Sequence, residues 1–187
     1  MKALRFYGKE DLRLVDVVEP EPSSGEVKIR VKVSGICRSD LHEYTSGPMG
    51  LPLKPHPRTG KAVPDITLGH EFSGEIVQIG PGVSGFASGD RVTVRPSRPC
   101  CHCKFCREGK PTLCPYVAFL GINDNGAFAP YIVTQASTVY KIPRGMSYEQ
   151  ASFCEHLAVA VHGVRKGQIG LNTTVAITGA GPIGLFK

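Results

Sequence analysis

Five of the seven cysteines in this sequence of 187 residues lie within CCHCKFCREGKPTLC, residues 100–114. Four of them have the spacing Cys-x2-Cys-x2-Cys-x7-Cys, namely Cys100, Cys103, Cys106 and Cys114. Such short spacings allow one loop to surround a tetrahedral ion with four thiolates about 2.3 Å away, whereas disulfides within so tight a run would be strained. Because four thiolates leave no position for substrate, we expect a structural zinc that stabilises the lobe of residues 97–115. An iron–sulfur cluster is the main alternative.

A second set of possible metal ligands is dispersed along the chain. Cys37 follows an alternating apolar and polar segment, and His70 begins another strand-like segment. Glu155 stands beside Cys154 in a predicted helix. One thiolate, one imidazole and one carboxylate suit a catalytic zinc with water in the fourth position. Each residue also has an ordinary structural interpretation, because a single cysteine or histidine is often a core residue.

The segment TTVAITGAGPIG predicts a nucleotide-binding turn. A short β-branched strand, residues 173–178, leads directly into a Gly-x-Gly-x-x-Gly pattern formed by Gly179, Gly181 and Gly184. In a dinucleotide-binding unit these glycines permit a tight turn, a close approach to the pyrophosphate and close packing of helix on strand. A doubly wound sheet needs far more sequence than remains before Lys187, so we expect the chain to end inside its second domain.

The elements that must position these residues are mostly strands. Residues 27–33 alternate strictly between apolar and basic side chains, which predicts a half-buried strand with one wet face. Further strand-like segments, separated by Gly- and Pro-rich turns, are 4–7, 12–15, 72–79, 91–94, 131–134 and 139–142. Many short strands of this kind predict a barrel or a sandwich. A capping box at Ser147 begins a predicted helix that continues to Lys166 and stops at Gly167.

Composition restricts the class of protein. Apolar residues make up 41% and charged residues 20%, which is ordinary for a soluble globular protein. No apolar run is long enough to span a membrane, and the N-terminus lacks an export signal, so we expect a cytoplasmic protein with reduced thiols. The formal charge is +6, concentrated in residues 91–110. We interpret this stretch as a solvated loop and expect no nucleic-acid partner, because Phe105 alone in the lobe could stack on bases.

The motifs GICRSDLH, GHEFSGEIVQIGPGV and GDRV, the four-cysteine lobe and GAGPIG follow one another as in a known family. In their order and spacing the whole sequence resembles zinc-dependent medium-chain alcohol and polyol dehydrogenases. The branch that it resembles most is that of the 2,3-butanediol dehydrogenases. The resemblance implies a β-rich GroES-like catalytic domain with a partly open barrel over residues 1–150. Residues 151–187 would form a connecting helix and the first strand and Gly turn of an incomplete Rossmann domain.

The resemblance also implies a catalytic zinc bound by Cys37, His70 and Glu155. Glu71 would be a carboxylate outside the metal's ligand set that can exchange with water on the metal. Asp40 would orient His70 without touching the metal. Simple alcohol dehydrogenases have a cysteine at the place of Cys154, but alignment with the polyol and butanediol pattern favours Glu155.

Other residues would transfer the proton of the substrate or bind the cofactor. The resemblance implies that Ser39 passes the alcohol proton to His42 and the cofactor ribose. Arg38 would contact the cofactor pyrophosphate, together with Gly179, Gly181 and Gly184. Two zinc ions per chain and NAD or NADP are the implied cofactors. The acidic residue that selects between NAD and NADP lies about twenty residues past the Gly pattern, beyond Lys187.

The implied substrates are secondary alcohols or vicinal diols such as 2,3-butanediol. The full-length protein would be a homodimer or homotetramer, whereas this chain lacks the dimer surface of the family and is expected to be inactive alone. Three alternatives stay open: a sorbitol or xylitol dehydrogenase, a quinone reductase relative without metal, and a fragment that folds around structural zinc only.

Three positions depart from the family pattern. His156 stands where the branch usually has proline after the ligand glutamate, and we expect its side chain to point outward. Arg38 and Cys101 each replace a glycine. None of these departures removes an expected ligand.

Overall fold

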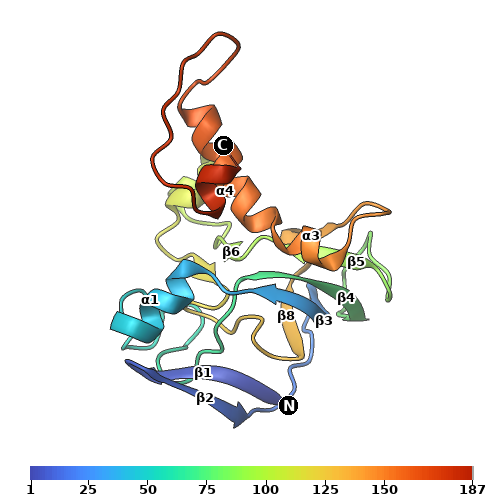
Figure 1. Ribbon diagram of the computed structural model, residues 1–187. Coiled ribbons are helices and arrows are strands. Elements are labelled where there is room, and N and C mark those ends of the chain that lie inside the picture. Colours follow the sequence, from blue (N-terminus) through green and yellow to red (C-terminus); the bar gives the residue numbers. More distant parts are fainter. Residues whose placement is uncertain (187) are drawn as a thin grey trace.

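A five-stranded antiparallel sheet with the order β8–β3–β4–β5–β9 forms the centre of the computed structural model, which describes residues 1–186 (Figure 1). Its strands are β3 (Glu26–Gly35), β4 (Glu71–Ile79), β5 (Arg91–Val94), β8 (Tyr131–Gln135) and β9 (Val139–Lys141). Two smaller antiparallel pairs are β1 (Lys2–Gly8) with β2 (Asp11–Asp16), and β6 (Ser97–Arg98) with β7 (Ala118–Phe119). The curled arrangement confirms the predicted β-rich, partly open barrel.

Short helices lie between and after the strands. They are α1 (Arg38–Ser46), α2 (Lys104–Arg107), α3 (Tyr148–Ser152), α4 (Cys154–Lys166), α5 (Pro182–Leu185) and the 3-10 turns η1 (Pro111–Leu113) and η2 (Ala136–Thr138). The predicted helix from Ser147 is confirmed, including its reciprocal capping box with Gln150 and its end at Gly167, but Phe153 divides it into α3 and α4. Within residues 1–186 no helix is long and apolar enough to cross a membrane.

The alternating apolar residues of the strands build the core. The larger cluster lies on the central sheet and contains Val27, Ile29, Phe72, Ile76, Val92, Val94, Leu120, Ala127, Ile132 and Val139. A smaller cluster lies beneath β1 and contains Phe6, Leu51, Ile66 and Leu68. The site described below lies where β3 ends and β4 begins, so its backbone is held by the larger cluster.

The face of β3 that is expected to be exposed to solvent is only partly exposed. Arg30 and Lys32 are exposed, as predicted, but Lys28 is only 4% exposed. Its ammonium lies 2.6 Å from a carboxylate oxygen of Glu19 and 2.9 Å from one of Glu21. The prediction was wrong at Lys28 because the segment between β2 and β3 covers this face and supplies the two carboxylates that a buried ammonium requires.

The predicted strand 173–178 does not form. These residues pair with no strand, and Val175 and Ile177 are 43% and 48% exposed. A strand of this kind needs a neighbour for its backbone hydrogen bonds, and residues 1–186 offer none beside it. The turn itself is present, since Gly179 has φ +95° and a Cβ on Gly184 would lie 2.1 Å from the Gly179 carbonyl oxygen. The division at residues 150 and 151 stays a prediction.

Backbone packing around Gly69 fixes the start of β4. The amide of Gly126 donates to the Thr67 carbonyl at 2.7 Å, and the amide of Phe128 donates to the Leu68 carbonyl at 2.9 Å. A Cβ on Gly126 would lie 2.1 Å from the Gly69 carbonyl oxygen. Only a glycine at 126 therefore allows the two segments to approach so closely.

We expect Gly126→Ala to lower the free energy of unfolding by about 1–3 kcal/mol, because the new methyl group meets backbone that cannot move aside cheaply. Denaturant unfolding of the variant measures the loss. Gly8→Ala is the matched control, since a Cβ there meets no atom within 4 Å. Equal stability of the two variants would contradict this interpretation of the packing.

Candidate metal centres

The four predicted cysteines of the lobe come together in the structure. The sulfur atoms of Cys100, Cys103, Cys106 and Cys114 all lie within 4.8 Å of one another. Cys106 Sγ lies 3.5 Å from Cys103 Sγ and 3.9 Å from Cys100 Sγ. Four bonds of about 2.3 Å to a tetrahedral zinc separate the sulfur atoms by about 3.8 Å. All seven cysteines are free thiols, so the lobe fits a four-thiolate metal site.

Hydrogen bonds in the lobe favour a shared negative charge. Burial opposes ionisation of Cys100, yet hydrogen bonds from the backbone of His102 and Cys103 and from neighbouring thiols lower its pKa to about 6. The pKa of Cys106 is raised to about 12 by burial and by the side chain of Cys103. Without a cation the cluster therefore keeps protons on some thiols, and a divalent metal supplies the positive charge that allows all four to ionise.

Cys101 lies outside this cluster. Its side chain is exposed, and its sulfur lies 3.6 Å from the Pro99 carbonyl oxygen. Its φ of +64° is in the left-handed region, which favours glycine. This explains why glycine suits the position in the family pattern, and why a cysteine there takes no part in the sulfur cluster.

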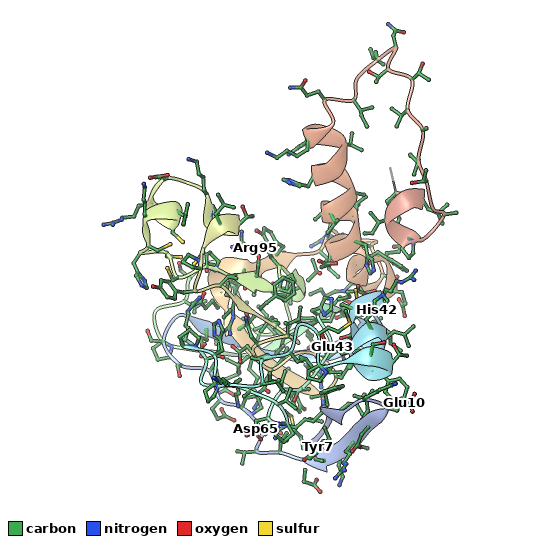
Figure 2. The ribbon with its side chains drawn as sticks, turned by 90° about the vertical axis from the view of Figure 1, so that its left-hand side faces the viewer. Tyr7, Glu10, His42, Glu43, Asp65 and Arg95 are labelled. Carbon is green, nitrogen blue, oxygen red and sulfur yellow. The ribbon has the colours of Figure 1, made fainter. Side chains whose placement is uncertain are left out.

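The second set of ligands converges where β3, β4 and α4 meet. Cys37 is the N-cap residue of α1 directly after β3, and its amide donates to Asp40 Oδ2 at 2.9 Å. His70 stands directly before β4, and the pairing of Gly35 with Glu71 brings the two strand ends together. Figure 2 shows that the sulfur atoms of the lobe gather well away from α1, the helix of His42 and Glu43. The two candidate centres are therefore separate.

Two overlapping groups of ligand atoms occupy this second centre. Cys37, His70 and Glu71 form one group, and Glu71, Glu155 and His156 form the other, with ligand atoms within 4.8 Å of one another in each. The expected ligands Cys37, His70 and Glu155 therefore do not form one close group. Glu71 belongs to both groups and links Cys37 and His70 to Glu155. Cys154 belongs to neither group.

Neighbouring polar residues surround His70. Ser39 Oγ lies 3.4 Å from His70 Nε2, which matches its expected place beside the ligands. Asp40 Oδ1 lies 3.8 Å from His70 Nδ1, beside the ring but beyond hydrogen-bond distance, and Nδ1 has no partner. Arg38 and His42 are exposed on α1, where Arg38 Nε donates to His42 Nε2 at 3.2 Å.

The buried charges of this centre fit a divalent cation. Asp40, His70 and Glu71 are all buried. Burial raises the pKa of the Asp40 and Glu155 carboxyl groups and of the Cys37 thiol. Glu71 Oε1 is a buried acceptor without an aligned donor. Acidic groups gathered away from water need a positive partner, and thiolate, imidazole and carboxylate are the ligand types of catalytic zinc.

The outward orientation expected for His156 is wrong. Its Nε2 lies 2.8 Å from Glu71 Oε1, and the two side chains are 13% and 2% exposed. The first turn of α4 lies over the start of β4, so the residue after Glu155 reaches the carboxylate of Glu71. Sequence reasoning missed this contact because the helix was placed by its pattern and not by the direction of its first turn.

A largely apolar cavity of about 570 Å³ adjoins the second centre. Its lining includes Glu155 and Val159 of α4, together with Phe119 and Met146. The Phe119 ring also lies 5.7 Å from the His70 ring, edge to face. The Gly turn returns toward the same end of α4, since the rings of Phe153 and Phe186 are 6.1 Å apart. Space for a small organic molecule therefore lies beside the candidate ligands.

Comparisons with known proteins agree with this arrangement. The model of the alcohol dehydrogenase GroES-like domain matches residues 23–144. Over its whole length the chain is 41% identical to (R,R)-butanediol dehydrogenase of Bacillus subtilis strain 168 and covers 53% of that protein. It is 38% identical, again over its whole length, to sorbitol dehydrogenase of the same strain and covers 51% of it.

Solved structures give the same result. The crystal structure of 2R,3R-butanediol dehydrogenase from Bacillus subtilis superposes with a TM-score of 0.90 at 41% identity, covering 99% of this chain and 52% of that one. The crystal structure of a short chain alcohol dehydrogenase from Escherichia coli CFT073, complexed with NADH, superposes with a TM-score of 0.85 at 36% identity, covering 100% of this chain and 51% of that one. The chain spans about half the length of the relatives it matches.

A curled β-domain that carries both a four-cysteine lobe and a separate cluster of cysteine, histidine and glutamate is typical of zinc-type dehydrogenases. The chain belongs to the alcohol dehydrogenase GroES-like domain family.

Proposed function

We propose that this chain is the catalytic-domain portion of a zinc-dependent, NAD- or NADP-linked dehydrogenase of secondary alcohols or vicinal diols such as 2,3-butanediol. The observation that carries the proposal is the buried cluster around His70 and Glu71 beside an apolar cavity. The similarity to a butanediol dehydrogenase supports the choice of substrate class. The proposal includes a homodimeric or homotetrameric full-length protein that acts on small molecules.

The two centres have different roles in this proposal. Cys100, Cys103, Cys106 and Cys114 hold a structural zinc. Cys37, His70 and Glu155 would hold the catalytic zinc, and Glu71 would be the carboxylate outside the ligand set that can exchange with water at the metal. Bound zinc supplies Lewis acidity that lowers the pKa of an alcohol hydroxyl, and a bound nicotinamide cofactor supplies the redox chemistry.

The protein's own residues orient the substrate and move its proton. Ser39 Oγ, 3.4 Å from His70 Nε2, accepts the proton of the alcohol. His42, one turn further along α1, passes it toward solvent. Asp40 accepts a hydrogen bond from the Cys37 amide and so fixes the turn at Cys37, while its other oxygen lies 3.8 Å from His70 Nδ1. Arg38 and the Gly turn formed by Gly179, Gly181 and Gly184 would hold the pyrophosphate of the cofactor.

The cavity favours a diol with alkyl ends over a long polyol. Its walls include Phe119, Met146 and Val159, which pack well against methyl groups. Arg95, Lys141 and His162 also line the cavity, but most of its wall is apolar, so the hydroxyl groups of sorbitol would find fewer partners there than in water. We therefore place 2,3-butanediol ahead of sorbitol among the candidate substrates.

We expect the full-length protein that carries this sequence to oxidise 2,3-butanediol with NAD⁺ or NADP⁺. Its kcat/KM should exceed that for sorbitol by about tenfold or more, measured through the absorbance of the reduced cofactor. The 187 residues alone should show no turnover, because a Gly turn without its sheet binds pyrophosphate poorly. Preference for sorbitol would contradict the diol assignment, and turnover by the 187 residues alone would contradict the need for further sequence.

A further inference from the structure

The carboxylate of Glu71 has a neighbour on α4 that the proposed chemistry does not use. His156 Nε2 lies 2.8 Å from Glu71 Oε1. Neither Glu71 Oε1 nor His156 Nδ1 has an aligned hydrogen-bond partner, although both atoms are buried. The Phe153 ring lies 6.0 Å from the His156 ring, so an aromatic neighbour helps to keep the imidazole in place.

The other oxygen of the Glu71 carboxylate, Oε2, lies against Gly35. Gly35 of β3 is paired with Glu71 of β4. A Cβ on Gly35 would lie 2.7 Å from Glu71 Oε2. The carboxylate therefore lies across β3 in space that a side chain would fill, between the Cys37 and His70 ligands and the first turn of α4. Both groups of ligand atoms remain within its reach.

A buried carboxylate at this place competes for the metal. If Glu71 joined Cys37, His70 and Glu155, four protein ligands would surround the zinc and leave no position for substrate. The His156 imidazole lies 2.8 Å from Glu71 Oε1 with its N–H out of line with that oxygen. Turned into line, the N–H would give the carboxylate an alternative partner, and hydrogen bonds to ionised groups are strong. The distance of 2.8 Å places His156 where it can hold Glu71 back.

We propose that His156 is a positioning residue that holds Glu71 on the α4 side of the cluster and keeps one metal position open. This inference rests on the proposed function, since it concerns the same metal centre. It deepens that function by naming the residue that regulates access of substrate to the metal.

The test compares His156→Ala, His156→Gln and the exposed control Val161→Ala in the full-length protein loaded with Co²⁺ at the catalytic centre. Imidazole is the probe, because it binds an open metal position and changes the visible spectrum of cobalt. In His156→Ala we expect the imidazole-induced change to be lost, chelator-driven metal loss to slow by about tenfold and kcat to fall by about tenfold. The amide N–H of His156→Gln should restore the wild-type spectrum.

A double mutant separates this role from simple packing. Once Glu71→Gln has removed the competing carboxylate, adding His156→Ala should leave the imidazole response unchanged. His156→Leu provides the same comparison if the alanine variant folds poorly. Faster metal loss in His156→Ala would identify His156 as a ligand and overturn the inference, and so would an unchanged imidazole response. Absence of metal from the wild-type centre would instead overturn the proposed function.

Discussion

Replacing Cys106 with serine is expected to remove one zinc ion per chain and most of the soluble yield of the protein. Cys106 Sγ lies 3.5 Å from Cys103 Sγ and 3.9 Å from Cys100 Sγ. The lobe has little core of its own, because neither α2 nor η1 contains a buried residue. In the proposed structural site, metal binding would supply the folding energy of the lobe, which for structural zinc sites is about 10–16 kcal/mol in peptides.

The measurements are zinc content, soluble yield and thermal unfolding. Cys101→Ser is the matched control, because Cys101 is exposed and outside the sulfur cluster, and we expect it to behave like the wild type. A soluble Cys106→Ser protein with unchanged zinc content and unchanged Tm would show that the lobe does not depend on this ligand.

Glu155→Ala should abolish the catalytic zinc, whereas Cys154→Ala should retain it. Successive residues of a helix point about 100° apart, so only one of the two can face the cluster. Glu155 shares a group of close ligand atoms with Glu71 and His156, and Cys154 shares none. Burial raises the pKa of the Glu155 carboxyl group, and the charge of the nearby His70 imidazole opposes the rise.

In the full-length protein we expect Glu155→Ala to retain the lobe zinc and to lower kcat by more than about a hundredfold. Cys154→Ala should keep both zinc ions and change kcat by less than about tenfold. Activity and metal analysis on the same preparations measure both effects. If instead Cys154→Ala lost the metal and Glu155→Ala kept it, the protein would use the ligand set of simple alcohol dehydrogenases and the diol assignment would be withdrawn.

Features encoded by local spacing could be predicted from the sequence. The four cysteines of the lobe lie close enough in the chain that their spacing alone defines a tetrahedral cluster. The alternation in residues 27–33 and the capping box at Ser147 each depend on a few neighbouring residues. The antiparallel sheet and the start of the helix followed from these local patterns.

Features that depend on packing between distant segments could not be predicted from the sequence. The burial of Lys28 requires Glu19 and Glu21 to fold back over the sheet, and alternation carries no sign of that. The inward orientation of His156 depends on the angle at which α4 meets β4. Residues 173–178 have a strand-like composition, but a strand forms only beside a partner.

The zinc content of the purified full-length protein, measured by elemental analysis before and after chelation, tests most directly whether the chain holds one closed and one open metal site. We expect two zinc ions per chain. A chelator should remove the one held by Cys37, His70 and Glu155, while the one enclosed by four cysteines should resist it. A single zinc ion per chain, or two that are lost at the same rate, would contradict the assignment of two metal centres with different roles.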